Sequence, residues 1–265
     1  MPEYYAGCDV GSTTGKAIIL QDSTIAGAAI LPSRIDPEET AREALEAAIA
    51  QVLGLQGVGD LAYLVGTGYG RNEVPFANEN ISEITCHGVG AHHCDAAVRT
   101  IVDIGGQDMK AIALNDDGSV REFAMNDKCA AGTGRFFEAM ARIFRMELEE
   151  FAALSLAARK VIPITAQCSV FAETEVISLI SKRNPPADIA AGVQAAVAKR
   201  VFSLARRVGV RSRLVITGGC AKNRGLAVML AEVLKTELSP LPVDAQLMGA
   251  LGAAVIAKRR AASMS

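Results

Sequence analysis

Two cysteines stand where a thiol could take part in chemistry. Cys129 lies in N-D-K-C-A-A-G-T-G, Cys168 opens C-S-V-F-A-E, and each precedes an apolar segment that we expect to be helical. The unsatisfied N–H groups and the dipole at a helix N-terminus favour a thiolate over a thiol. Both cysteines are therefore candidate metal ligands or reactive groups.

The spacing of these cysteines matches no common metal motif of a single chain, because neither has a CxxC partner. A [4Fe–4S] cluster needs four thiolates, and one chain offers two in this setting. Two chains would supply four around a two-fold axis. A shared Zn²⁺ site, a disulfide between 129 and 168, and two unconnected buried thiols are the alternatives that the spacing leaves open.

The other cysteines and the histidines are interpreted as structural. Cys8 and Cys220 are expected to be small hydrophobic residues on buried strands. The segment C-H-G-V-G-A-H-H-C gathers residue types that bind metals, but on a helix its two cysteines lie two turns apart, too far for one tetrahedral ion. We predict a Gly-interrupted helix that packs on the first sheet. The residues concerned are Cys86, His87, His92, His93 and Cys94.

Two aspartates occur in a repeated segment that could bind a nucleotide. D-V-G-S-T-T-G-K-A-I-I-L begins at Asp9, D-I-G-G-Q-D-M-K-A-I-A-L begins at Asp103, and the two align without a gap at an offset of 94 residues. Each copy has the pattern of an apolar strand ending in Asp, a Gly turn and a second strand. Backbone N–H groups at such a turn can approach an anion closely, and the carboxylate can hold Mg²⁺ through water.

The first of these turns adds the hydroxyls of Ser12, Thr13 and Thr14 and the cation of Lys16. One copy alone could be an ordinary hairpin turn, and it is not a Walker A loop, because only three residues separate its glycines and Ala follows the lysine. The duplication favours a nucleotide, since two facing turns would hold a triphosphate from both sides. A third Gly-rich segment, L-V-I-T-G-G-C-A-K-N-R-G, is expected to end a strand and contact adenosine.

Further elements are predicted in both halves to position these residues. A third strand is expected in each, at S-T-I-A-G-A-A-I-L and at S-V-R-E-F-A-M. Helices are predicted from Asp36 to about Leu53, over 135–151 and over 189–208, from capping residues or from apolar residues at helical spacing. The fold class predicted is a duplicated α/β chain with a ligand cleft between two similar domains.

Composition excludes other classes of function. Half of the 265 residues are hydrophobic, the formal net charge is −2 and the pI is near 6, which argues against a nucleic-acid binder and against a protein of anionic membranes. No charge-free apolar stretch is long enough to span a bilayer, and M-P-E-Y-Y lacks the features of a signal peptide. We expect a cytoplasmic protein whose thiols stay reduced.

The two repeats and the late T-G-G resemble, over the whole chain, the nucleotide-binding fold shared by acetate and sugar kinases, the 70-kDa heat-shock proteins and actin. The resemblance implies ATP and Mg²⁺ in the cleft and closure of the two domains about a hinge. It also implies that the last helix, over 246–265, crosses back to the first domain. The domains expected are residues 1–101 with that helix, and residues 102–245.

Matching positions carry the site of that fold onto this chain. Asp9 and Asp103 are implied to surround Mg²⁺ and the attacking water, and Gln107 to orient that water. The residues expected at the phosphates are Gly11, Ser12, Thr13, Thr14, Lys16, Gly105 and Gly106, and those expected at adenosine are Gly218, Gly219 and Lys222.

Longer motifs resemble a narrower family. N-D-K-C-A-A-G-T-G-R-F-F, C-S-V-F-A-E-T-E-V-I-S, V-G-T-G-Y-G-R-N and V-D-I-G-G-Q-D-M-K are similar to segments of the ATP-dependent activators, or components A, of 2-hydroxyacyl-CoA dehydratases. The same family holds the ATPase subunits of benzoyl-CoA reductases. The resemblance implies a homodimeric ATPase in which Cys129 and Cys168 of both chains hold one bridging [4Fe–4S] cluster.

In this interpretation the cluster passes one electron to a separate dehydratase component, and ferredoxin or flavodoxin supplies that electron. We further predict that the turn from Gly132 to Gly134, next to Cys129, faces the nucleotide. One alternative is the ATPase subunit of a benzoyl-CoA reductase-type complex, paired with a paralogue. A small-molecule kinase of the same fold, with a sugar pocket and no iron, is an alternative from another class.

Overall fold

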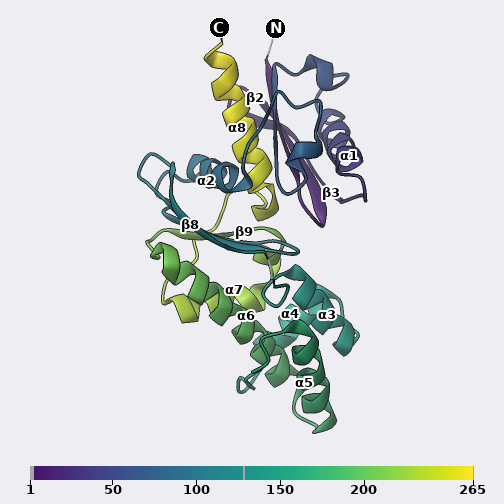
Figure 1. Ribbon diagram of the computed structural model, residues 1–265, viewed down its shortest axis with the longest axis vertical. Helices are drawn as coiled ribbons and strands as arrows, with labels where there is room; N and C mark the ends of the chain where they lie inside the picture. The colour runs from purple at the N-terminus through teal and green to yellow at the C-terminus, as the bar shows by residue number, and fades with distance from the viewer. Residues whose placement is uncertain (1–2, 128, 265) are drawn as a thin grey trace. The chain divides into compact units, whose positions relative to one another are not determined.

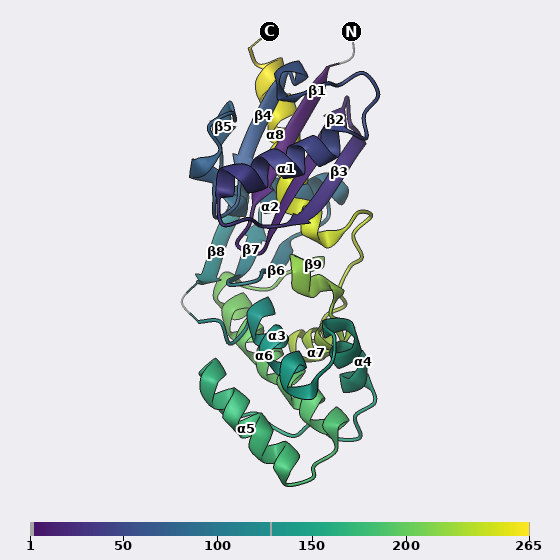
Figure 2. The same cartoon turned by 90° about the vertical axis from the view of Figure 1, so that its right-hand side faces the viewer.

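The computed structural model describes residues 3–127 and 129–264, and the chain forms two compact units. The first unit comprises Met1–Ile101, Leu114–Arg121 and Leu241–Ser265, and the second comprises Val102–Ala113 and Glu122–Pro240. Each unit is an α/β body built on its own sheet (Figures 1 and 2). Among the described residues, no helix combines the length and the apolar character that a bilayer crossing requires.

The sheet of the first unit has the strand order β3-β2-β1-β4-β5. Its strands are β1 (Tyr4–Val10), β2 (Thr14–Gln21), β3 (Thr24–Pro32), β4 (Tyr63–Thr67) and β5 (Glu79–Asn80). The first three strands form an antiparallel meander, and β4 pairs parallel to β1. Because side chains alternate along a strand, Ile18 and Leu20 enter the core on one face of this sheet and Ala17 and Ile19 enter the core on the other.

Helices cover both faces of this sheet. The helices of the unit are α1 (Pro37–Ile49), α2 (Glu83–Cys94) and α8 (Met248–Ala262), with short 3-10 turns η1 (Val58–Asp60), η2 (Arg71–Glu73) and η4 (Ala245–Leu247). α1 packs on β1, β2 and β3, and lies in front of the sheet in Figure 2. α8 packs on β1, β2 and β4.

The start of α1 follows the capping signal in the sequence. The Asp36 carboxylate accepts the N–H of Glu38, and Pro37 occupies the first turn, where its missing N–H costs nothing. The helix ends at Ile49, four residues before the predicted end, and the chain continues in turns to Leu55.

The segment 86–94 is an unbroken part of α2 and, among the described residues, no group of three or more His, Cys, Asp or Glu side chains is placed to hold a metal ion. The helix was predicted to pack on the first sheet, but it packs chiefly on α8. The glycines explain this contact: a Cβ on Gly90 would overlap Met248 O, and a Cβ on Gly252 would overlap Cys86 O. Small residues therefore let the two helix backbones touch.

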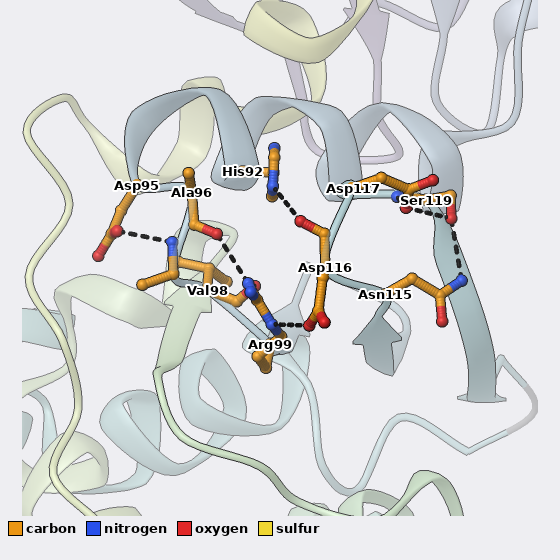
Figure 3. Close-up of polar contacts among 10 residues, drawn as sticks. His92, Asp95, Ala96, Val98, Arg99, Asn115, Asp116, Asp117 and Ser119 are labelled. Carbon is orange, nitrogen blue, oxygen red and sulfur yellow. Dashed lines mark hydrogen bonds and ion pairs between the residues drawn. The ribbon is translucent and has the colours of Figure 1, made fainter.

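His92 has a structural role in this unit (Figure 3). Its Nε2 lies 3.3 Å from the carbonyl oxygen of Asp116, and its ring packs on Gly118, whose φ of +82° no side chain adopts easily. The Asp116 carboxylate also accepts from Arg99 Nε at 2.9 Å. The hairpin turn at 115–119 is thereby fastened to α2.

The sheet of the second unit has the order β8-β7-β6-β9. Its strands are β6 (Thr100–Ile104), β7 (Met109–Leu114), β8 (Val120–Asn126) and β9 (Leu214–Thr217). The order repeats that of β3-β2-β1-β4 in the first unit, strand for strand. The predicted duplication of an α/β unit is therefore confirmed, including the third strand of each half.

The helices of the second unit are α3 (Gly134–Phe144), α4 (Leu148–Leu156), α5 (Ser169–Ser181), α6 (Pro186–Val208) and α7 (Arg224–Leu234). The prediction of one helix over 135–151 is wrong, because Arg145 adopts a left-handed conformation, with φ of +56°, and ends α3. Phe144 and Phe151 still pack together across this break, with ring centroids 5.2 Å apart. The apolar spacing in the sequence therefore continues across the break at Arg145, although the helix ends there.

Candidate nucleotide and thiol sites

The first repeat places a buried ion pair beside a tight turn. β1 and β2 pair so that Asp9 lies directly opposite Lys16, and Asp9 Oδ2 is 3.3 Å from Lys16 Nζ. Both side chains are largely buried, at 6% and 12% exposure. Between them the chain turns at Gly11, whose N–H donates to the carbonyl oxygen of Thr14 at 3.1 Å. Ser12 and Thr13 lie partly exposed at the tip of this turn.

The second repeat has the same geometry. Asp103 Oδ2 lies 3.3 Å from Lys110 Nζ, and the N–H of Gly105 donates to the carbonyl oxygen of Asp108 at 3.0 Å. The Asp108 carboxylate adds a second ion pair to Lys110, at 2.8 Å. Gly106 is partly exposed and Gln107 exposed in this turn. Each unit therefore presents a carboxylate held by a lysine next to a glycine turn.

A Thr-Gly pair completes the arrangement in each unit; the sequence analysis assigned Gly218 to adenosine but missed both threonines and Gly68. Thr67 ends β4 and Thr217 ends β9, and each is followed by a glycine with positive φ, +92° at Gly68 and +81° at Gly218. A Cβ on Gly68 would overlap Asp9 Oδ1, and a Cβ on Gly218 would lie 2.9 Å from Asp103 Oδ1. The matching segments L-V-G-T-G and L-V-I-T-G were the available signal.

The second Thr-Gly pair also bonds the carboxylate directly. Thr217 Oγ1 donates to Asp103 Oδ1 at 2.8 Å, between two buried side chains. Asp103 therefore has one oxygen at a lysine and the other at a hydroxyl, which fixes the orientation of its carboxylate. A fixed, hydrogen-bonded carboxylate is suited to orienting water around Mg²⁺.

His87 is a second residue that sequence reasoning did not assign to this site. It is buried on α2, and its Nε2 lies near Gly249, where a Cβ would stand 3.1 Å from His87 Nε2 and 2.7 Å from Asp9 Oδ2. Because Gly249 has no side chain, the His87 imidazole and the Asp9 carboxylate can both approach its backbone on α8. The signal was a histidine on a buried helix face, which by itself indicates no function.

The proposed adenosine residues follow β9. Gly218 leads into a short 3-10 turn, η3 (Gly219–Lys222), before α7 begins. Cys220 is buried in this turn and not on a strand as predicted, and burial raises the pKa of its thiol to about 12. Cys8 is buried on β1 as predicted, and burial likewise raises its pKa. Neither thiol is suited to act as a thiolate.

Cys129 does not stand at a helix N-terminus, contrary to the prediction. α3 begins at Gly134, five residues later, and Thr133 is its N-cap. The intervening residues form turns instead, in which the carbonyl oxygen of Ala130 accepts the N–H groups of Gly132 and Thr133 and the hydroxyl of Thr133. Cys129 itself is partly exposed.

The end of this segment is bonded to the glycine turn of the second repeat. The N–H of Gly134 donates to the carbonyl oxygen of Gly105 at 2.9 Å, and the N–H of Arg135 donates to that of Gly106 at 3.0 Å. These are N–H groups of the first turn of α3, which lack partners inside the helix. One short segment therefore runs from Cys129 to the glycines that we assign to a phosphate.

Cys168 is the N-cap residue of α5, so its predicted place at a helix start is confirmed, and the structure shows that it is exposed. The segment before it is fastened to two helices. The Asp188 carboxylate of α6 accepts the N–H groups of Arg159 and Lys160, and the Glu175 carboxylate of α5 accepts those of Thr165 and Ala166. An exposed thiol thus projects from a well-anchored loop.

A family model described as the BadF/BadG/BcrA/BcrD ATPase family matches residues 6–257. The activator of lactoyl-CoA dehydratase from Anaerotignum propionicum is 44% identical over 96% of this chain and 97% of its own length. Component A of the (R)-2-hydroxyglutaryl-CoA dehydratase from Acidaminococcus fermentans has a similar structure, with a TM-score of 0.90 and 42% identity over 98% of this chain and 99% of that one.

A second related structure contains a nucleotide. The activator of the 2-hydroxyisocaproyl-CoA dehydratase from Clostridium difficile, with bound ADPNP, has a TM-score of 0.92 and 40% identity over 98% of this chain and 96% of that chain. A ROK hexokinase from Thermus thermophilus, at 14% identity and a TM-score of 0.55 over 97% of this chain and 99% of its own, shares the fold alone, as the resemblance to sugar kinases implied. The chain therefore belongs to the BadF/BadG/BcrA/BcrD ATPase family.

Proposed function

We propose that the chain is an ATP-hydrolysing activator of a 2-hydroxyacyl-CoA dehydratase. In this proposal two copies share one [4Fe–4S] cluster, and ATP hydrolysis drives the transfer of a single electron to the dehydratase component. The names of the similar proteins support the class of partner, since they are activators of dehydratases that act on 2-hydroxyacyl-CoA substrates. The family membership supports the ATPase activity.

The nucleotide is assigned to the two repeated turns. Asp9 and Asp103 would hold Mg²⁺ through water, and their orientation by Lys16 and Lys110 suits them to that task. The N–H groups of Gly11 and Gly105 close the two turns, so those at the tips, at Ser12 and Thr13 and at Gly106 and Gln107, would be the ones offered to the phosphates. The ADPNP in a relative with 40% identity supports a nucleotide in this fold. The two compact units would act as the two ATPase halves.

The two cysteines fit a cluster that is shared between chains. Cys129 and Cys168 are free thiols that reach the surface, whereas the interpretation as buried thiols requires the opposite. Among the described residues of one chain, no group of three or more Cys, His, Asp or Glu side chains is placed to hold a metal ion, so neither cysteine belongs to a complete site within it. A [4Fe–4S] cluster takes four thiolates, so two chains would complete it, and when bound it would supply one electron at low potential.

One observation carries the link between hydrolysis and electron transfer. Gly134 and Arg135 donate to the carbonyl oxygens of Gly105 and Gly106, and Cys129 begins the same segment. A phosphate bound by N–H groups of the second turn would displace that turn, and these carbonyl groups with it. The segment then transmits the displacement to Cys129 through a few backbone bonds.

Anaerobic purification followed by cluster reconstitution tests the proposal. We expect brown protein with about four irons per dimer, and colourless protein after reconstitution would refute the proposal in favour of the small-molecule kinase. Cys168→Ala should lose the iron and still bind ATP. Cys94→Ala is the matched control, because Cys94 is partly exposed but lies in the other unit beside Met248. Retention of iron by Cys168→Ala would show that the ligand assignment is wrong.

A further inference from the structure

One cation on α6 contacts the segments of both cysteines. Arg200 Nη2 donates to the carbonyl oxygens of Ala166 and Gln167, at 3.0 and 3.1 Å, directly before Cys168. Together with Glu175, which accepts the N–H of Ala166, it holds this loop from two helices. Hydrogen bonds that involve a charged group are stronger than neutral ones, so this anchor is firm.

The same side chain packs on the segment of Cys129. Its guanidinium carbon lies 5.7 Å from the ring centroid of Phe136 on α3, within the range of a cation–π contact. Its stem passes Gly132, where a Cβ would stand 3.6 Å from Arg200 Cδ. Arg200 is therefore the bridge between two segments that lie far apart in the sequence.

The charge of Arg200 is also incompletely matched. Its Nη1 is buried and makes no hydrogen bond to any described residue. Burial lowers the pKa of the guanidinium, while a thiolate at Cys129 opposes that effect by attraction. A buried donor without a partner costs free energy, so its place against the segment of a thiol points to an anionic group that completes it.

We propose that Arg200 is a positioning residue for the cysteine pair: it sets the Cys168 loop against the Cys129 segment and places a positive charge beside the thiolates. The inference rests on the proposed function, because the anionic group is the thiolate-bound cluster. A nearby positive charge favours the reduced cluster, which carries one more negative charge than the oxidised form. Arg200 would therefore raise the reduction potential as well as hold the ligands in place.

The sequence contained a signal for this residue. Arg200 lies seven residues after Val193 and three after Val197, on or beside the apolar face of α6 that is buried in the core. A cation at such a position needs a specific partner. The signal was not specific enough to identify which partner.

Arg200→Gln, Arg200→Lys and Arg206→Gln are the variants to compare. Arg206 is the control, because it also packs on an aromatic ring of its own helix, that of Phe202, but is exposed. The reduction midpoint of each reconstituted dimer is measured by dithionite titration, and ADPNP affinity reports correct folding. Hydrogen exchange of the Thr165 and Ala166 N–H groups is measured on protein without iron.

For Arg200→Gln we expect ADPNP binding as in the wild type and hydrogen exchange in the loop that is at least tenfold faster. The reduction midpoint should become more negative by about 59 mV, which is a tenfold change in the equilibrium constant of a one-electron reduction. Arg200→Lys should keep the midpoint within threefold but share the faster exchange. Unchanged exchange in Arg200→Gln would overturn the positioning role, and an unchanged midpoint would overturn the electrostatic one. If the wild-type protein binds no iron after reconstitution, the proposed function is refuted, whereas the exchange result still tests the positioning role of Arg200.

Discussion

Replacing Gly68 by Ala is expected to weaken binding of Mg-ATP at least tenfold. Gly68 has φ of +92° and touches the carboxylate that we assign to Mg²⁺. A methyl group there would overlap Asp9 Oδ1 and stand 2.5 Å from the carbonyl oxygen of Val10. The backbone of β1 is fixed by its pairing with β2 and β4, so the Asp9 side chain is the part that can yield.

Two terms make up the expected cost. A non-glycine residue at positive φ costs about 1–2 kcal/mol, and overpacking of a close contact adds about 1–3 kcal/mol. The second term acts on Asp9 and so on the ligand, and a loss of about 1.4 kcal/mol in binding is tenfold in affinity. The overall destabilisation should be about 2–5 kcal/mol by the sum of these terms.

Gly54→Ala separates the two terms. Gly54 has nearly the same φ, +95°, in the same unit, but no atom lies within 4 Å of its Cβ position. We expect this control to lose about 1–2 kcal/mol from the backbone term alone and to bind ADPNP as the wild type does. Urea unfolding and calorimetric titration measure both quantities. Equal destabilisation of the two variants, with unchanged affinity in Gly68→Ala, would refute the argument from close approach.

Two further predictions concern the second unit. Thr217→Val leaves one buried oxygen of Asp103 without its hydroxyl donor, so unfolding by urea should show a loss of about 1–3 kcal/mol, with a slower ATPase; unchanged values of both would contradict the role of this bond. The second of these predictions concerns Glu175. Burial raises the pKa of its carboxyl, but the N–H groups of Ala166 and Thr165 outweigh that effect, so the pKa is lowered from its ordinary 4.5. Its stabilisation of the loop is therefore present above pH 4.5 and lost as the pH falls through the folded pKa, so hydrogen exchange corrected for its intrinsic pH dependence should accelerate there in the wild type and not in Glu175→Gln.

The parts of the site that the sequence predicted are those within one hairpin. Asp9 and Lys16 face each other because β1 and β2 are joined by a short turn, and the copy at Asp103 and Lys110 repeats the pattern. Local spacing therefore determines these pairs. Thr217 bonds Asp103 across 114 positions of the sequence, and only the neighbouring places of β6 and β9 in the sheet bring them together. No local pattern could indicate that contact.

The helix boundaries near the cysteines were harder to predict for a related reason. Apolar spacing reports which side chains enter the core, and it continues from Phe144 to Phe151 across a break in the backbone. The end of α3 depends on the left-handed Arg145, a conformation that the residue type does not favour. The start of α3 depends on hydrogen bonds from Gly134 to a distant turn, so Cys129 lies before the helix and not at its mouth.

The two repeats also differ in a way that bears on their function. In the first unit the carbonyl oxygen of Gly11 accepts the hydroxyl of Ser33 at 2.8 Å, so that turn is tied to the chain after β3. In the second unit the equivalent carbonyl, that of Gly105, accepts the N–H of Gly134 at 2.9 Å. A shift of the first turn therefore strains a loop, whereas the same shift of the second turn pulls on the segment of Cys129. In the proposed function, this difference would connect nucleotide hydrolysis at the second turn, and not at the first, to the segment of Cys129.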